Sequence, residues 1–525
     1  MFRPYAVFCR QMKVGSKVLL VQPLAFCPDM KGQSMQFRLR YVPVLLAGFL
    51  SACSSHQSGV SVVSSPSCSQ QLREFDALIT DQGQRNIGAA PVAGYRFLRA
   101  NRNSVLMGKQ VGTAIAQGAQ GELLFADWVA QMRALDRDAR ADELRNLPVA
   151  AELSLTEVEN CASQMAAGLT IGDYASLSKA VFVPDDYLDF QRIAGFYPLT
   201  AFAAHFGYES WKRDNFGSFD LSEEALQASG PWQRYRADGQ GDAGQDAIAI
   251  KAIEEDAFGR IIPTHAELKS LAERYAPEFR IRTLTSSDRI GTPALPSREG
   301  LSIVDLDRPA IYYRLSHTWF NNQWRPQIIY SVWFPERPAQ GMFDILAGHL
   351  DALIWRVTLD GEGHPLIADS IHGCGCYHMF FPTSSLQRIV APEDGDIRET
   401  AESPAGAVPS ATLARPVLWV DAISHYLLAV TPENSDVKTL APIKASMQPE
   451  QSLASIPLKD GSGYESLYDE DGFVPGTERM ERFILWPMGV DRPGAMRQWG
   501  HHATAFVGRR HFDEPALYER YFELR

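Results

Sequence analysis

The stretch Ser370–Met379, SIHGCGCYHM, concentrates side chains that can ligate a metal ion or attack a carbonyl group. Four of them alternate with other residues: His372, Cys374, Cys376 and His378. On an extended strand these four would share one face, with roughly 6.6–6.8 Å between neighbours. Thiolate and imidazole are ligands that zinc and copper favour. Because Gly373 and Gly375 let the backbone fold back, the stretch predicts a soft-metal site, either catalytic or structural.

Other histidines could complete this site, since nine of the twelve follow residue 300. His349 and Asp351 form a His-x-Asp pair, a spacing that places both side chains on one face of a strand, as in some non-haem iron sites. If a hairpin turns near Glu362, His349 and the cysteines lie beyond the same end of it. His317 is a further candidate ligand. A second-rank site is predicted from three more histidines: His501, His502 and His511.

A disulfide between Cys374 and Cys376 is an alternative interpretation. Cys68 and Cys161 would then form the other pair, which would leave no free thiol in the body of the protein. The protein would in that case be a non-enzymatic scaffold that binds glycans or proteins of the cell envelope. Such a module would expose aromatic side chains for stacking on sugars, whereas burial would indicate core packing. The candidates are Trp319, Trp324 and Trp333.

The segment Ser370–Gly375 also resembles the Ser-His-Gly-Cys segment of peptidoglycan L,D-transpeptidases, although Ile371 interrupts the pattern. In these periplasmic enzymes a thiolate attacks a peptide carbonyl and a histidine acts as base. The resemblance implies an acyl transferase that acts on cell-wall peptide, with Cys374 as nucleophile and His372 or His349 as base. Residue spacing alone identifies no catalytic residue, so the sequence leaves open whether the protein is an enzyme.

The location of the protein is predicted by the apolar run Tyr41–Leu50, which follows a short basic segment. Its length is about half of what a bilayer span requires and is typical of a signal peptide. The run ends in Leu50-Ser51-Ala52-Cys53, which resembles the lipobox of bacterial lipoproteins. The resemblance implies that Cys53 carries a diacylglycerol and that the leader is removed before it. Ser54 resembles the signal for sorting to the outer membrane.

The lipobox lies unusually far into the chain. We infer that translation starts at Met35, so that residues 1–34 are a mis-assigned extension and residues 35–52 are the signal peptide. The Ser-rich stretch 53–70 then forms a flexible tether to the lipid anchor, at the periplasmic side of the outer membrane. This compartment is oxidising.

Charge limits the possible partners. Residues 1–52 contain seven Lys or Arg and one Asp, a net charge of +6. Because the whole chain has a net charge of −12, residues 53–525 have a net charge of −18. Such an acidic body repels phosphate backbones, so we expect no nucleic-acid partner. The expected partners are the membrane, through the lipid anchor, and cell-wall components or envelope proteins.

The pattern of residues changes near residue 283. Residues 71–282 are predicted to be helical, with apolar residues at helical spacing over 121–147 and capping boxes that begin at Ser154 and Thr264. Residues 283–525 contain β-branched and alternating runs, as in 353–359. Long loops are expected at 391–415 and 434–480. The sequence predicts an α+β fold, with a helical N-terminal half followed by a β-rich, mainly antiparallel C-terminal half.

Overall fold

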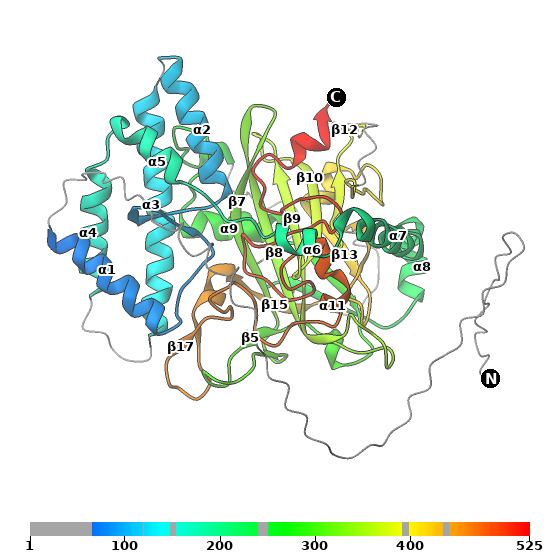
Figure 1. Ribbon diagram of the computed structural model, residues 1–525. Coiled ribbons are helices and arrows are strands. Elements are labelled where there is room, and N and C mark those ends of the chain that lie inside the picture. The colour runs from blue at the N-terminus through cyan, green and yellow to red at the C-terminus, as the bar shows by residue number, and fades with distance from the viewer. Residues whose placement is uncertain (1–65, 119, 148–153, 240–249, 391–397, 434–440) are drawn as a thin grey trace, which may run out of the picture. The chain divides into compact units, whose positions relative to one another are not determined.

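The computed structural model describes residues 66–118, 120–147, 154–239, 250–390, 398–433 and 441–525 (Figure 1). All of them belong to one compact unit, Gly59–Arg525, and the hydrophobic core clusters described below lie within it. The predicted leader, Cys53 and most of the predicted tether lie outside the described residues. No helix in the described ranges has both the length and the apolar character needed to cross a bilayer.

The N-terminal part of this unit is a layer of helices. It comprises α1 (Pro66–Asp81), the hairpin β1 (Ala90–Val92) and β2 (Tyr95–Ala100), α2 (Arg102–Ala116), α3 (Gly121–Asn146), α4 (Leu155–Ala167) and α5 (Tyr174–Ala180). Apolar side chains at helical spacing, such as Met107 and Trp128, form their common core with Phe97 of the hairpin. A disulfide between Cys68 and Cys161 joins α1 to α4. From the sequence, this pair is expected only as part of the interpretation in which Cys374 and Cys376 form a second disulfide.

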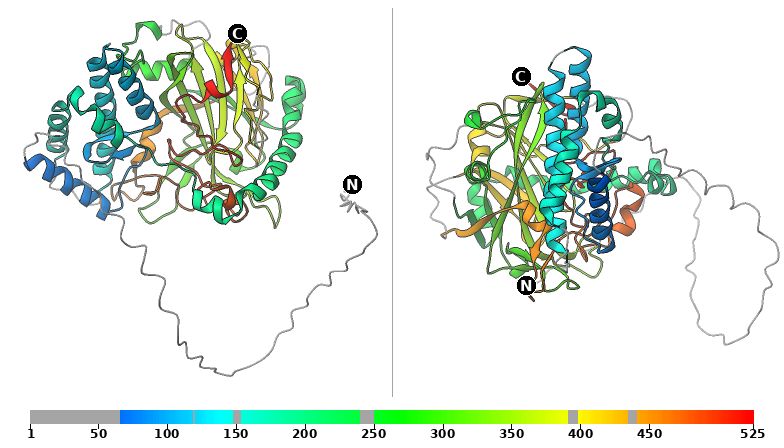
Figure 2. Two further views of the ribbon diagram at one scale, coloured as in Figure 1. Left: turned by 45° about the horizontal axis from the view of Figure 1, so that its top comes forward. Right: turned by 90° about the vertical axis from the view of Figure 1, so that its left-hand side faces the viewer.

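A ten-stranded sheet forms the centre of the unit (Figure 2). In spatial order its strands are β11 (Met379–Pro382), β10 (Pro365–His372), β9 (Gly348–Leu359), β8 (Gln323–Arg337), β7 (Ala310–Phe320), β15 (Ile443–Pro449), β3 (Trp232–Ala237), β4 (Glu278–Arg282), β13 (Pro416–Val420) and β14 (Leu427–Pro432). Strands β7 to β11 form one antiparallel meander. Three pairings are parallel: β15 with β7, β15 with β3, and β13 with β4.

The predicted α+β class is therefore correct, but the sheet is mixed and only partly fits the expected antiparallel arrangement. Strands β3 and β4 come from the stretch predicted to be helical, and β15 lies within the predicted loop 434–480. The residues of β15, IKASMQP, are mostly polar or small, so they carry little strand signal. Backbone pairing with β7 and β3 makes this segment a strand. The predicted loop 391–415 likewise contains α10 (Ser410–Ala414).

The two faces of the sheet are covered differently. Helix α9 (His265–Tyr275) packs on one face, where Leu353 and Trp355 belong to the largest core cluster. The hydroxyl of Tyr330 donates a hydrogen bond to the carbonyl of Ala272 in α9, at 2.7 Å. Thr264 forms the predicted capping box of this helix. Irregular segments near the C-terminus cover the other face, where Trp499 and Phe512 share a small core cluster with strand residues.

The remaining helices and strand pairs lie around the sheet and the helical layer (Figure 1). They are α6 (Asp189–Ala194), α7 (Tyr197–Asn215), α8 (Glu223–Ala228), α11 (Arg482–Leu485) and the strand pairs β5 (Thr292–Ala294) with β6 (Ile303–Asp305), β12 (Leu386–Arg388) with β18 (Phe522–Leu524), and β16 (Ile456–Pro457) with β17 (Tyr464–Glu465). Helices α6 and α7 both contact the single turn η6 (Trp486–Met488), which follows α11 directly. Distant parts of the chain therefore meet beside the end of the sheet where β10 stops.

Candidate functional site

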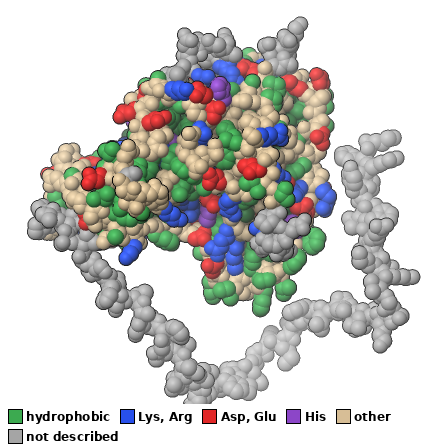
Figure 3. Space-filling view, turned by 90° about the horizontal axis from the view of Figure 1, so that it is seen from above, with side chains coloured by type: hydrophobic (Ala, Val, Ile, Leu, Met, Phe, Trp, Pro, Cys, Tyr) green, Lys and Arg blue, Asp and Glu red, His purple; other side chains and the backbone are tan. Residues whose placement is uncertain are grey.

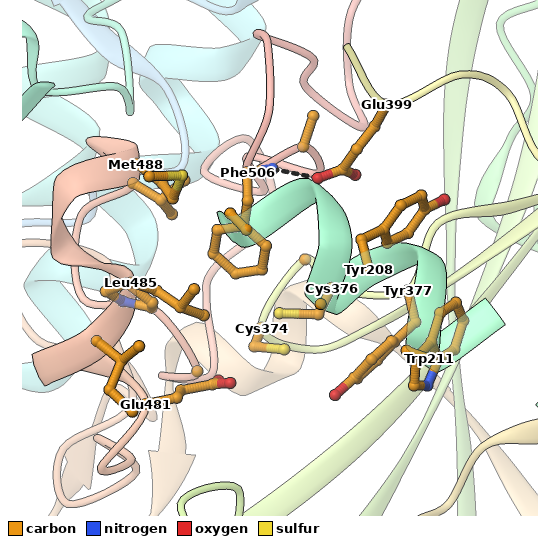
Figure 4. A pocket seen from close by; sticks show the side chains of 18 of the residues that line it. Tyr208, Trp211, Cys374, Cys376, Tyr377, Glu399, Glu481, Leu485, Met488 and Phe506 are labelled. Carbon is orange, nitrogen blue, oxygen red and sulfur yellow. Dashed lines mark hydrogen bonds between the residues drawn. The ribbon is translucent and has the colours of Figure 1, made fainter. Parts of the chain in front are cut away.

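A cavity of about 470 Å³ lies between α7, α11 and the loop that follows β10 (Figure 4). This volume is typical of small-molecule sites. Most lining side chains are apolar, among them Trp211 from α7, Leu485 from α11 and Phe506. Cys374 and Cys376 lie in its wall. The predicted His/Cys stretch therefore borders a preformed apolar chamber.

The loop after β10 holds both cysteines in a tight turn. The backbone N–H of His372 donates to the carbonyl of Cys376 at 3.0 Å, and Nε of Arg497 donates to the carbonyl of Cys374 at 3.0 Å. Gly375 has a φ of +92°, and a Cβ on this residue would lie 2.4 Å from the carbonyl oxygen of Ala503. Only glycine tolerates both the conformation and the close approach. The sequence Cys-Gly-Cys is thus what allows the two thiols to face the cavity.

Cys374 and Cys376 are both free and buried, so the structure does not contain the disulfide considered as an alternative. The neighbouring thiol of Cys376 lowers the pKa of Cys374, and the guanidinium of Arg479 acts in the same direction against burial. The interaction with Cys374, together with burial, raises the pKa of Cys376 well above its ordinary value. Cys374 is therefore the member of the pair that favours the thiolate, the nucleophilic form.

A buried charged cluster adjoins the loop, with Asp351 at its centre. Oδ2 of Asp351 lies 2.9 Å from Nδ1 of His425, and Oδ1 lies 3.1 Å from Nη2 of Arg479. Nδ1 of His372 lies 3.6 Å from the same Oδ1, just beyond hydrogen-bond distance. Burial opposes the charge on Asp351, but Arg479 and His372 hold its pKa well below the usual range. Burial lowers the pKa of His372, which favours a neutral imidazole.

Two tyrosines connect this cluster to the cavity. The hydroxyl of Tyr426 donates to that of Tyr377 at 2.9 Å, and both residues line the cavity. The ring of Tyr377 packs edge-on against His372, with 5.0 Å between centroids. Four non-glycine residues around this site have positive φ: Leu350, Tyr377, Ile423 and His425. Such strained residues cluster at functional sites because the surrounding structure must hold them in place.

Two glutamates also line the cavity, in different roles. A carboxylate oxygen of Glu399 accepts hydrogen bonds from the backbone N–H groups of Phe506 and Val507, at 2.8 and 3.1 Å, which fixes that loop. Glu481 reaches toward the cysteine loop in Figure 4. Burial raises its pKa. Glu481 can therefore hold a proton next to the thiols.

The described residues contain no group of three or more His, Cys, Asp or Glu side chains arranged to hold a metal ion. His378 instead bonds Asp369 through Nε2 at 2.9 Å and Thr504 through Nδ1 at 3.2 Å. His349 lies at the end of the hairpin that the register predicted, but its Nε2 contacts the carbonyl of Ser302 at 2.7 Å. In the part of the chain that the structure describes, His349 and His378 therefore have partners other than the cysteines of the predicted soft-metal site.

His317, the remaining candidate ligand, lies on β7, where its carbonyl accepts a hydrogen bond from Asn103 of α2. The tryptophans proposed for sugar stacking lie within the structure: Trp324 and Trp333 are buried, and the half-buried Trp319 packs edge-on against Trp324. Core packing accounts for all three. Zinc or copper binding stays a prediction, which metal analysis of the purified protein tests.

The second-rank histidines divide into two environments. His501 and His511 both contact Asp186: Nδ1 of His501 at 2.9 Å and Nε2 of His511 at 3.3 Å. His502 is buried elsewhere, next to Trp499, and burial lowers its pKa to about 3. Burial opposes protonation of His501 and His511, but hydrogen bonds to aspartates raise the pKa of both. This group ties the segment before α6 to the C-terminal loops.

We expect the variant His501→Gln/His511→Gln to lower the free energy of unfolding by about 1–3 kcal/mol at about pH 6, because it removes partners of a buried carboxylate. The folded-state pKa of each histidine exceeds the unfolded value of about 6.5. The stabilisation is therefore complete below that pH and is lost as the pH rises through the folded-state pKa. Denaturant unfolding from about pH 5 to about pH 9 measures this dependence. An identical pH dependence in wild type and variant would contradict the prediction.

Several residues of the site carry no sequence signal. Arg479 and Glu481 lie in the predicted loop 434–480 or just after it, and His425 and Tyr426 follow β13. The apolar cavity wall from α7 is indistinguishable in sequence from a core-facing helix. Comparison with protein-family models, with curated proteins and with solved structures finds no match to this chain, so its function must be argued from the site.

Proposed function

We propose that this protein is an envelope-anchored, thiol-dependent acyl hydrolase or acyl transferase. Cys374 is the nucleophile, and the apolar cavity holds the acyl chain of the substrate. The observation that carries the proposal is the position of a thiol that favours the thiolate in the wall of an apolar chamber of about 470 Å³. Catalytic cysteines typically occupy such electropositive surroundings, whereas buried structural cysteines are inert.

The chemistry follows from these groups. The Cys374 thiolate attacks the carbonyl carbon of an ester, thioester or amide, and a carbon–sulfur bond forms as the bond to the leaving group breaks. The leaving group takes a proton, for which Glu481 is the candidate donor because burial raises its pKa and so favours the protonated form. Water or an acceptor nucleophile then attacks the thioester and releases the thiolate. Neutral His372 beside Asp351 is the candidate base for that second step.

The apolar lining favours an aliphatic acyl group over the cell-wall peptide implied by the transpeptidase resemblance. A peptide would bring several backbone donors and acceptors into a chamber with few partners for them. The lipobox supports anchoring at Cys53 in the envelope. The disulfide between Cys68 and Cys161 supports an oxidising compartment, because such bonds persist outside the cytosol.

The direct test is to trap the acyl-enzyme. The chain from Ser54 onward retains the whole compact unit Gly59–Arg525 and omits the anchor. After a brief reaction with p-nitrophenyl decanoate and acid quench, we expect a decanoyl adduct in mass spectra of the peptide that contains Cys374. The Cys376→Ser variant keeps a hydrogen-bond donor and should form the same adduct. An adduct on Cys376, or none at either thiol, would contradict the proposal.

A further inference from the structure

An apolar surface on α6 and α7 continues into the cavity. Leu199, Phe202 and Phe206 recur at helical spacing along the outer side of α7 and are at least half exposed. Phe190 and Ile193 of α6 extend the same surface with exposures of 80% and 78%. Monomeric proteins rarely leave such a continuous apolar face in water, so a partner is expected.

The segment around α11 adds a second set of exposed apolar side chains: Met480, Phe483, Ile484 and Trp486. Arg192 of α6 donates through Nε to the carbonyl of Met488 at 2.7 Å, and the backbone N–H of Leu188 donates to the carbonyl of Gly489. These contacts place α6 beside η6. Figure 3 views the molecule from above, so the side that faces the reader in Figure 1, with α6, α7 and α11, lies at its lower edge. Hydrophobic side chains gather at this edge.

The cavity opens within this surface. Ile484 is 61% exposed and also lines the cavity, and Ala203 and Gly207 of α7 are both exposed and part of the lining. Charges of both signs lie on the same elements: exposed Arg213 and Arg482, and exposed Asp189 and Asp214. Phenylalanine, leucine and tryptophan gathered on one face are typical of helices that lie in the interface of a bilayer.

We propose that α6, α7 and α11 dock on a lipid bilayer and that the acyl chain of a membrane lipid enters the cavity from this surface. The predicted anchor at Cys53 is compatible with this arrangement, since the thirteen residues 53–65 that precede Pro66 reach about 45 Å when extended. Docking itself depends only on the surface. The identification of the substrate as a bilayer lipid rests on the proposed function.

Vesicle flotation of the chain from Ser54 onward tests the docking, with vesicles of phosphatidylethanolamine and phosphatidylglycerol. We expect the protein to float, and Leu199→Glu to weaken its partitioning by about ten-fold or more, because a leucine that enters the bilayer on docking is replaced by a charge. Leu123→Glu is the matched control: Leu123 is similarly exposed, at 61% against 72% for Leu199, but lies on α3. The control should float like the wild type, and unchanged melting temperatures should show that both variants fold.

Two results would overturn the docking proposal. One is the absence of flotation in the wild type. If sedimentation then shows a dimer that Leu199→Glu dissociates, the apolar surface binds a second copy of the chain and not a bilayer. The other is equal flotation of all three proteins. Cys374→Ser separates this proposal from the proposed function, because it should abolish acyl-adduct formation while flotation remains. Flotation without any adduct in the wild type would retain the docking surface and reject the acyl chemistry.

Discussion

Replacing Cys374 by alanine is expected to lower the turnover of p-nitrophenyl decanoate by at least about a thousand-fold, since the remaining thiol, Cys376, has a pKa well above its ordinary value and does not favour the thiolate. The substitution removes a side chain in the wall of an existing cavity, so we expect the fold to be retained. Initial rates of p-nitrophenol release, with the melting temperature as a check on folding, measure the effect. Residual turnover within about ten-fold of the wild type would contradict the assignment of Cys374 as nucleophile.

The neighbouring thiol provides the matched controls for this experiment. Cys376→Ser keeps a donor to the sulfur of Cys374, whereas Cys376→Ala removes it and should raise the pKa of Cys374. The alanine variant should therefore lose activity near neutral pH and regain it at higher pH, where the thiolate forms without the donor. A purely structural role for Cys376 would change the stability and leave the pH profile of the rate in place.

The sequence located the centre of this site because two cysteines with intervening glycines are an unusual local pattern. It also gave the register of the hairpin, since the alternation of Leu353, Trp355 and Val357 and the turn after Asp360 are local signals. His349 consequently lies at the predicted end of β9. The sequence could not show that Asp351 turns to His372 and His425 while His349 turns to Ser302, because such partners come from segments distant in the chain.

The metal prediction was made from ligand chemistry, and the geometry does not bring the ligands together. Alternation would place His372 and His378 on one face only if the strand continued through the stretch. The tight turn ends β10 at His372, and His378 instead contacts Asp369 and Thr504. Cys374 and Cys376 face the cavity. The pattern therefore identified two cysteines that line the cavity, and metal binding by this stretch stays a prediction.

The cavity and the central strand β15 were beyond sequence reasoning for a common reason. The sequence pattern of α7 is the same whether its apolar residues face a core, a cavity or solvent. A short polar strand has the sequence pattern of a loop. What decides each case is the neighbour: β7 and β3 for the strand, and α11 with the cysteine loop for the cavity wall. Long-range pairing overrides local propensity in such segments.

Asp351→Asn is expected to lower the free energy of unfolding by about 3–5 kcal/mol, because it leaves buried cationic groups without their partner. Arg479 and His425 both contact the carboxylate of Asp351, and all three side chains are almost completely buried. An amide has a similar shape, so the loss reports the charge and not a cavity. Denaturant unfolding at neutral pH measures the change.

The matched control is Asp471→Asn, which breaks an ion pair with Arg492 at the surface, where the aspartate side chain is 59% exposed. Exposed pairs contribute less than about 1 kcal/mol to the free energy of unfolding.

The pH dependence gives a second check on Asp351: its folded-state pKa lies well below its unfolded value. Its stabilisation is therefore fully present above an unfolded pKa of about 3.9 and is lost as the pH falls through the folded-state pKa. The variant should lack this component of acid unfolding. Equal losses in the two variants would mean that Asp351 is solvated like a surface group and does not organise the cluster beside Cys374.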